Sequence, residues 1–201
     1  MNLKSQIANR KSKINKVVVI AASAGGIDAL TQVLSGLPAD LPAAILVVQH
    51  LRNDRPTRLP EHLGRHSHLR VCLAQDGMAL EVGVVWVAVP GEHLIIENRH
   101  IVLSSEEMMN YVRPSADLLF ASAARAFGRD LIGVVLSGTG RDGTRGCQDI
   151  KAKGGMTIAQ DEATSRYFDM PRAAINAGAI DYVLPVHEIG AKIVEILKID
   201  D

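Results

Sequence analysis

Apolar residues along the chain fall into short runs that are bounded by polar turns. Such runs predict buried strands at residues 17–22, 43–49, 131–136 and 156–160. Between most of these runs, apolar residues recur at helical spacing, which predicts helices over residues 27–36, 115–127, 143–153 and 187–199. Strands that alternate with helices form a mostly parallel sheet. We therefore expect a doubly wound α/β fold, in which helices flank a mostly parallel sheet.

Residues 82–103 interrupt this alternation. They form short apolar runs joined by turn sequences at Pro90-Gly91 and Asn98-Arg99. Short runs joined by such turns are typical of antiparallel strands. A small antiparallel extension at one edge of the sheet is therefore expected.

Length and composition favour one folded unit. The chain has 201 residues, of which 47% are hydrophobic, enough to bury one sizeable core. No internal repeat or second apolar core is evident, so residues 17–201 are expected to form a single domain. Residues 1–16 contain five basic residues and no acidic one, which is typical of a solvated tail or linker.

Charge and cysteine content exclude several classes of protein. Lysine plus arginine and aspartate plus glutamate both number 22, so no global field favours nucleic acid or an anionic membrane as a partner. No apolar run approaches the roughly 20 residues that cross a bilayer. Two cysteines are too few for a disulfide scaffold. Residues 1–16 lack the apolar segment of a signal peptide, so we expect a cytoplasmic protein.

Three predicted strands are followed by reactive side chains. Ser23 follows the first strand, His50 follows the second, and Asp142 lies in the loop after the strand at 131–136. Sites in open α/β sheets form at the carboxyl ends of the strands. In nucleophilic acyl transfer, a histidine takes the serine proton and a carboxylate orients that histidine. The three residues therefore form a candidate catalytic triad.

The pair Gly25-Gly26 after Ser23 leaves a second interpretation open. A dinucleotide site at this position needs G-x-G-x-x-G, but only Gly25 and Gly26 follow the first strand, and the lysine followed by serine or threonine that a P-loop needs is absent there. Amides at a helix N-terminus can instead bind an oxyanion. Ala21 replaces the first glycine of a G-x-S-x-G elbow, and the order Ser, His, Asp is not that of α/β-hydrolases. The residues alone leave catalysis and a Rossmann-like binding site as alternatives.

A family resemblance becomes specific when six separated segments are taken together. They are "VIAASAGGIDAL", "LVVQHL", "VAVPGEHL", "VRPSADLLFASAA", "GVVLSGTGRDGTRG" and "AQDEATSRYFDMPRAAINAG". Their order and separations resemble those of the CheB-type protein-glutamate methylesterases of bacterial chemotaxis, over roughly residues 17–197. The resemblance implies that residues 17–201 form a methylesterase catalytic domain.

The resemblance also implies an activity. Such enzymes hydrolyse glutamate methyl esters on cytoplasmic helices of chemoreceptors, releasing methanol, and some members deamidate receptor glutamines. Ser23 matches the nucleophile, His50 the general base and Asp142 the orienting acid. Neither a metal nor an organic cofactor is implied. The partner would be a chemoreceptor or a receptor of a related signalling system. The alternative is a catalytically weak relative that binds a receptor or signalling partner.

Further residues are implicated around the triad by the same resemblance. The loop from Gly138 to Gly143 matches G-M-G-x-D-G, with Thr139 in the position whose amide helps to bind the oxyanion, followed by Gly140. An amide of Ala24 is the second expected donor. Met170 and Pro171 are expected to form a rigid turn beside the site. Candidates for the substrate cleft are His93, Arg113 and Ser115, for which backbone-bonded turn and helix-entry roles are the alternatives.

The chain departs from the family pattern in several places. Ala24 replaces the threonine of S-T-G-G, Val89 replaces a proline, and Asp169 replaces the glycine before Met170. Many members also carry an N-terminal receiver domain, and the 16 residues before the first strand are too few for one. We therefore expect an accessible site, or control by a separate regulatory partner.

Overall fold

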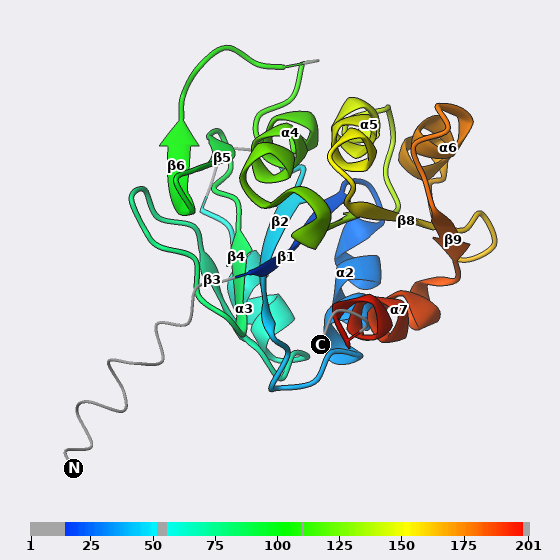
Figure 1. Ribbon diagram of the computed structural model, residues 1–201, viewed down its shortest axis with the longest axis horizontal. Helices are drawn as coiled ribbons and strands as arrows, with labels where there is room; N and C mark the ends of the chain where they lie inside the picture. The colour runs from blue at the N-terminus through cyan, green and yellow to red at the C-terminus, as the bar shows by residue number, and fades with distance from the viewer. Residues whose placement is uncertain (1–14, 52–55, 110, 199–201) are drawn as a thin grey trace.

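The computed structural model describes residues 15–51, 56–109 and 111–198. Seven parallel strands of this part form the main sheet, in the order β3-β4-β2-β1-β7-β8-β9 (Figure 1). These strands are β1 (Lys16–Ala22), β2 (Ala43–Gln49), β3 (Arg70–Leu73), β4 (Val84–Val87), β7 (Leu131–Val135), β8 (Met156–Gln160) and β9 (Tyr182–Leu184). The expected mostly parallel sheet is confirmed.

The strand order reverses at β1. From β1 the chain first builds the side of the sheet that holds β2, β3 and β4, and it then returns to pair β7 with the other side of β1. In a doubly wound sheet this reversal opens a crevice at the carboxyl ends of the central strands. The loops after β1, β2 and β7 therefore meet at one place.

Helices cover both faces of the sheet, as a doubly wound fold requires. One face carries α2 (Gly26–Ser35), α3 (Leu59–Gly64) and α7 (Val186–Lys198), and the other carries α4 (Ala116–Phe127), α5 (Thr144–Ala152) and α6 (Asp169–Asn176) (Figure 1). A short 3-10 helix, η1 (Gly128–Asp130), leads from α4 into β7.

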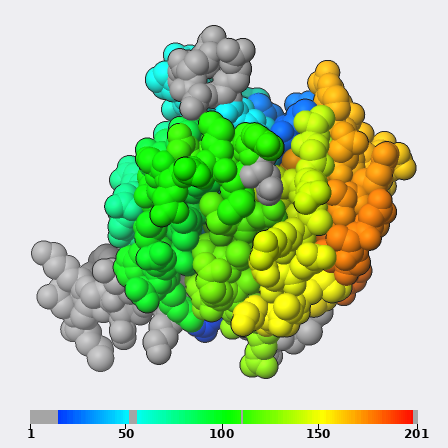
Figure 2. Space-filling model, turned by 90° about the horizontal axis from the view of Figure 1, so that it is seen from above, coloured from blue at the N-terminus to red at the C-terminus, as the bar shows by residue number. Residues whose placement is uncertain are grey.

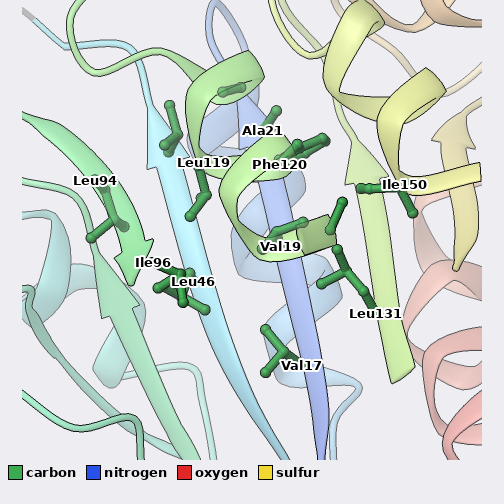
Figure 3. Close-up of a cluster of buried hydrophobic side chains, with 14 of the residues drawn as sticks. Val17, Val19, Ala21, Leu46, Leu94, Ile96, Leu119, Phe120, Leu131 and Ile150 are labelled. Atoms are coloured by element: carbon green, nitrogen blue, oxygen red, sulfur yellow. The ribbon is translucent and has the colours of Figure 1, made fainter. Parts of the chain in front are cut away.

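The strand β1 is apolar throughout because both of its faces are buried. Val17, Val19 and Ala21 pack under α4 and α5, together with Phe120 and Ile150 (Figure 3). The alternate residues Val18, Ile20 and Ala22 pack with α2 and α7 on the other face of the same sheet. A continuous apolar run is the expected pattern for a central parallel strand.

The antiparallel element is a separate hairpin. Its strands β5 (His93–Glu97) and β6 (His100–Ser104) pair only with each other as a sheet, and the turn between them contains Asn98 and Arg99 in left-handed conformation. The hairpin packs on α4, where the amide of Ile96 donates to Ser122 Oγ at 3.1 Å. The expected antiparallel element is thus confirmed, although β4, from the same interrupted segment, belongs to the parallel sheet.

Five elements were not predicted from the apolar pattern: α3, β3, η1, α6 and β9. All are short, and the edge strands β3 and β9 have no fully buried residue. Their side chains therefore lack the apolar run of a central strand. Residues 1–14 lie outside the described residues, so the N-terminal tail stays a prediction, except that β1 already begins at Lys16. Within the described part, none of the helices is long and apolar enough to span a bilayer.

Candidate active site

Ser23 is the first residue after β1, and its backbone is fixed by the strands on both sides. Its amide donates to the carbonyl of Ser137, after β7, at 3.0 Å. Its carbonyl accepts hydrogen bonds from the Gln49 side-chain amide of β2 at 2.8 Å and from the Gly26 amide at 2.9 Å. Ser23 remains partly exposed at this junction. The side chain therefore projects from a rigid backbone at the switch point.

The two glycines after Ser23 are required by packing. Gly25 has a φ of 72° at the start of α2, and a Cβ there would lie 2.8 Å from Ser137 Oγ. A Cβ on Gly26 would lie 2.5 Å from Gln49 Oε1 and 2.6 Å from Ala22 Cβ. The pair lets α2 begin directly against β1 and β2, which accounts for both glycines without a bound phosphate.

His50 and Asp142 form a hydrogen-bonded pair. His50 Nε2 lies 2.9 Å from Asp142 Oδ2, and the side chains are only 15% and 5% exposed. The amide of His50 donates to the carbonyl of Ala22 at 3.0 Å, so His50 and Ser23 leave adjacent strands side by side. Among the described residues, no hydrogen bond joins Ser23 Oγ to His50. Since Nε2 faces Asp142, Nδ1 is the ring nitrogen left for another partner.

Asp142 is held by the N-terminus of α4. Oδ1 accepts hydrogen bonds from Ser115 Oγ at 2.9 Å and the Asp117 amide at 3.1 Å, and Oδ2 accepts one from the Ala116 amide at 2.6 Å. Burial alone would raise the pKa of Asp142, but the hydrogen bonds from His50 and from these amides outweigh it and lower the pKa. Asp142 is therefore a fixed anion beside His50.

Asp117 fixes the loop that carries Asp142. Its Oδ1 accepts hydrogen bonds from the amides of Gly143 at 2.9 Å and Gly146 at 2.8 Å, at the start of α5. Burial is the main cause that raises the pKa of Asp117, and the nearby charge of Asp142 raises it further. The two helices α4 and α5 are thereby joined at their N-termini, next to His50.

The loop after β7 packs tightly against Ser23. A Cβ on Gly138 would lie 2.8 Å from Ser23 Cβ and 2.2 Å from Met170 Sδ, so only glycine fits there. The Gly138 amide donates to the carbonyl of Tyr167, and the Met170 amide donates to the carbonyl of Gly138. Met170 and Pro171 are buried in the first turn of α6. Met170 thus packs against Gly138 from the first turn of α6, and a rigid turn of Met170 and Pro171 beside Ser23 stays a prediction.

The amides of Ala24 and Thr139 differ from that of Gly138. No described residue accepts a hydrogen bond from either amide. Ala24 is half-buried, while Thr139 and Gly140 are exposed, and Gly140 turns the loop with a φ of 89°. Two backbone donors are thus left available on the loops that flank Ser23.

The three residues expected in the substrate cleft have other roles. His93 is completely buried, and its ring bonds the Ser115 amide through Nδ1 and the Glu107 carbonyl through Nε2. Ser115 is completely buried against Asp142. Arg113 donates from Nη1 to the carbonyls of Ser105 and Glu106, both at 2.7 Å. The cleft assignment is therefore corrected for His93 and Ser115, which are buried at the N-terminus of α4 that holds Asp142. Arg113 holds the segment after β6, and its place in a substrate cleft stays a prediction.

Three supporting residues were missed by the sequence analysis: Gln49, Ser137 and Asp117. Gln49 donates from its side-chain amide to the carbonyls of both Ser23 and His50, at 2.8 and 3.0 Å. Ser137 Oγ donates to the Ala24 carbonyl and accepts from the Tyr167 amide. The position of Gln49 and Ser137 at the ends of apolar strands is the signal that could have identified these two residues. Acidic residues such as Asp117 are common in the first turn of a helix, where they stabilise its N-terminus, so the sequence did not indicate a role in the site.

Fold and site together define a doubly wound α/β domain whose switch point brings together a serine, a histidine and a buried aspartate. The family model described as CheB methylesterase matches residues 18–193, and the chain belongs to this family. The crystal structure of the Thermotoga maritima CheB methylesterase catalytic domain superposes with a TM-score of 0.87 at 36% identity. That match covers 90% of this chain and 98% of the other.

Curated relatives agree with this placement. A protein of Anaeromyxobacter dehalogenans named protein-glutamate methylesterase/protein-glutamine glutaminase 2 is 47% identical over 183 residues, covering 91% of this chain and 54% of that relative. The protein-glutamate methylesterase FrzG of Myxococcus xanthus is 41% identical over 180 residues, covering 89% and 54%. The chain spans about half the length of these curated relatives.

Proposed function

We propose that this chain is a serine esterase that hydrolyses glutamate methyl esters on chemoreceptor cytoplasmic helices through Ser23, His50 and Asp142. The observation that carries the proposal is the His50–Asp142 hydrogen bond of 2.9 Å. His50 follows β2, which pairs with β1, and Ser23 follows β1. A binding module has no physical need for a buried carboxylate that orients a histidine beside a serine.

Acylation begins with proton transfer from Ser23. His50 Nδ1 takes the hydroxyl proton as Ser23 Oγ attacks the ester carbonyl, and Asp142 stabilises the imidazolium through Nε2. The hydrogen bond between Ser23 Oγ and His50 is absent among the described residues, and in this proposal it forms when substrate is bound, as catalytic hydrogen bonds often do. Asp142 stays ionised throughout, consistent with its lowered pKa.

The tetrahedral intermediate carries a negative charge on the former carbonyl oxygen. The amides of Ala24 and Thr139 are the donors proposed for it, since no described residue uses either of them. An amide is available from any residue other than proline, so threonine in place of the family's methionine retains the donor. Losing one such donor typically costs about 100- to 1000-fold in turnover.

Methanol leaves with the proton that His50 holds, and the acyl group stays on Ser23. Water then attacks the acyl-enzyme, with His50 again as the base, and restores Ser23 and a glutamate carboxylate. Deamidation of a glutamine would follow the same steps with ammonia as the leaving group. This second reaction is proposed because relatives are named protein-glutamine glutaminase as well.

A second candidate is a receptor-binding relative whose triad residues are retained without turnover. The observation that favours it is the missing hydrogen bond between Ser23 and His50 in the described part of the chain, together with Ala24 in place of threonine. The two functions differ in the reactivity of Ser23.

A fluorophosphonate probe of activated serines separates the two candidates. The esterase predicts a label on Ser23, located by peptide mass spectrometry, that is lost in His50→Ala and kept in His66→Ala. His66 is an exposed histidine that follows α3. An unlabelled native chain, or a label that does not depend on His50, would support the binding module.

A further inference from the structure

A groove of about 960 Å³ runs between α4 and α5, the helices seen face-on in Figure 2. Ser23 and His50 do not line it, but it begins directly beside their partner. Asp117 lines the groove and donates its backbone amide to Asp142, and Arg141 lines the groove immediately before Asp142 in the chain. A ligand that lies along the groove would therefore end at the candidate active site.

The walls of the groove are cationic. Four exposed basic residues line it: Arg125, Arg141, Arg145 and Lys153. None of them forms an ion pair with a residue that the structure describes. Two acidic residues face the same groove, Asp149 and Asp117, and the carboxylate of Asp117 is engaged by the amides of α5. The local excess of positive charge contrasts with a chain whose formal net charge is zero.

The floor of the groove is apolar and shallow. Between the basic residues lie Leu118 and the small side chains of Ala121, Ala124, Ala152 and Ala173. Small residues allow the backbone of a packed helix to approach closely. Met109 lines the groove and is 42% exposed, and its neighbour in the chain, Met108, is 56% exposed. Exposed methionines are adaptable contacts for an apolar side chain.

The positive charge and the apolar floor of the groove favour an acidic helix as the ligand. The product of ester hydrolysis is a glutamate, so a helix with several such positions carries carboxylates whenever it is not fully methylated. Residues 1–16 of this chain are excluded as occupants because five basic residues would repel the groove. An alanine and methionine floor suits the apolar stripe of a helix better than the stacked bases of nucleic acid.

We propose that the groove between α4 and α5 binds an acidic amphipathic helix of the substrate protein and presents the adjoining ester to Ser23. This inference rests on the proposed function. The carboxylates of the bound helix lie between Arg125 of α4 and Arg145 of α5, and its apolar stripe packs on the alanine side chains of the groove. The groove thus sets substrate affinity, while Ser23, His50 and Asp142 perform the chemistry.

Kinetics with two substrates test the inference. The variants are the charge reversal Arg125→Glu/Arg145→Glu and the matched control Arg65→Glu. Arg65 is exposed at the end of α3, on the other face of the sheet, and forms no ion pair with a described residue. The first substrate is a methylated chemoreceptor cytoplasmic fragment, followed by methanol release. The second is p-nitrophenyl acetate, which is too small to contact the groove.

The double reversal is expected to raise KM for the receptor fragment roughly tenfold at low salt, with kcat changed less than about twofold, because exposed charges act mainly on association. Hydrolysis of p-nitrophenyl acetate by the double reversal, and all kinetic values for Arg65→Glu, should match those of the native chain.

The inference is overturned if the double reversal leaves KM for the receptor fragment unchanged, or if it lowers activity on both substrates equally. It is also overturned if a 20-base-pair DNA duplex, rather than a glutamate-rich helical peptide, competes with the fragment. Methanol release that survives Ser23→Ala would instead overturn the proposed function.

Discussion

Asp142 and Asp117 each accept hydrogen bonds from the N-terminus of the other's helix. Asp142, which precedes α5, accepts the Ala116 and Asp117 amides of α4, while Asp117, in the first turn of α4, accepts the Gly143 and Gly146 amides of α5. Helix N-termini carry partial positive charge and unsatisfied amides, so both carboxylates satisfy donors that would otherwise be buried unpaired. This reciprocal arrangement fixes the position of Asp142 relative to His50.

Replacing Asp142 by asparagine should damage both activity and stability. An asparagine side chain has one acceptor oxygen, whereas Asp142 accepts on two, so its NH2 group must face donors such as the Ala116 amide. We expect esterase turnover to fall by about 10³- to 10⁴-fold and the free energy of unfolding to fall by about 1–3 kcal/mol. Methanol release and urea unfolding measure the two effects. Native stability in Asp142→Asn would contradict the account of the α4 contacts.

Two substitutions of Asp117 should differ sharply. Asp117→Asn keeps an oxygen for the Gly143 and Gly146 amides and removes a charge that burial disfavours. Asp117→Ala leaves both amides without this acceptor. We expect urea unfolding at pH 7 to show Asp117→Ala about 1–2 kcal/mol less stable than the native chain, and Asp117→Asn no less stable than the native chain. An equal loss in both variants would show that the charge itself is needed.

The lowered pKa of Asp142 predicts a loss of stability in acid. Between its folded value and the ordinary aspartate value of about 4, the unfolded chain binds more protons than the folded chain. Stability is therefore present above that range and is lost as the pH falls through the folded value. Asp181, whose pKa is lowered by hydrogen bonds from Lys151 and Thr157 despite opposing burial, adds to the same loss.

Urea unfolding between pH 2.5 and 6 tests whether stability is lost toward acid. The free energy of unfolding should decline toward acid in the native chain and decline less steeply in Asp142→Asn, in which Asp181 still titrates. Curves of equal slope would mean that Asp142 has the same proton affinity in the folded and unfolded chains.

Gly138 should tolerate no side chain. A Cβ would overlap Met170 Sδ and Ser23 Cβ, at 2.2 and 2.8 Å. Met170 is a flexible side chain that can be shortened, whereas Ser23 is fixed to its strand. We expect Gly138→Ala to be unstable and inactive, and Gly138→Ala/Met170→Ala to recover part of the stability, as judged by thermal unfolding, without esterase activity. Full activity in the double variant would contradict the close packing at Ser23.

The central fold could be predicted from the sequence because its strands are buried on both sides. The runs at β1, β2, β7 and β8 are continuous and apolar, so their positions were confirmed to within a residue or two. The strand β3 escaped prediction because its residues, such as Arg70, lie at an exposed sheet edge. The hairpin was foreseen from its turn sequences, but its packing on α4 depends on tertiary contacts that no local pattern contains.

Only those residues of the site that follow predicted strands could be predicted from the sequence. Ser23, His50 and Asp142 follow apolar runs, and the structure brings His50 and Asp142 into contact. The environment of Asp142 was not predictable, because Ser115 and Asp117 are typical of helix entry and contact Asp142 only through the packing of α4 on α5. His93 was misplaced because a histidine after a turn gives no indication that both ring nitrogens are bonded in the core.

Methanol release from a methylated chemoreceptor fragment tests the central claim most directly. The native chain is compared with Ser23→Ala and with Ser35→Ala, an exposed serine at the last position of α2 whose hydroxyl donates to the Gln32 carbonyl. A triad esterase predicts native release in Ser35→Ala and a loss of at least about 1000-fold in Ser23→Ala. Equal release from Ser23→Ala and the native chain would contradict Ser23 as the nucleophile.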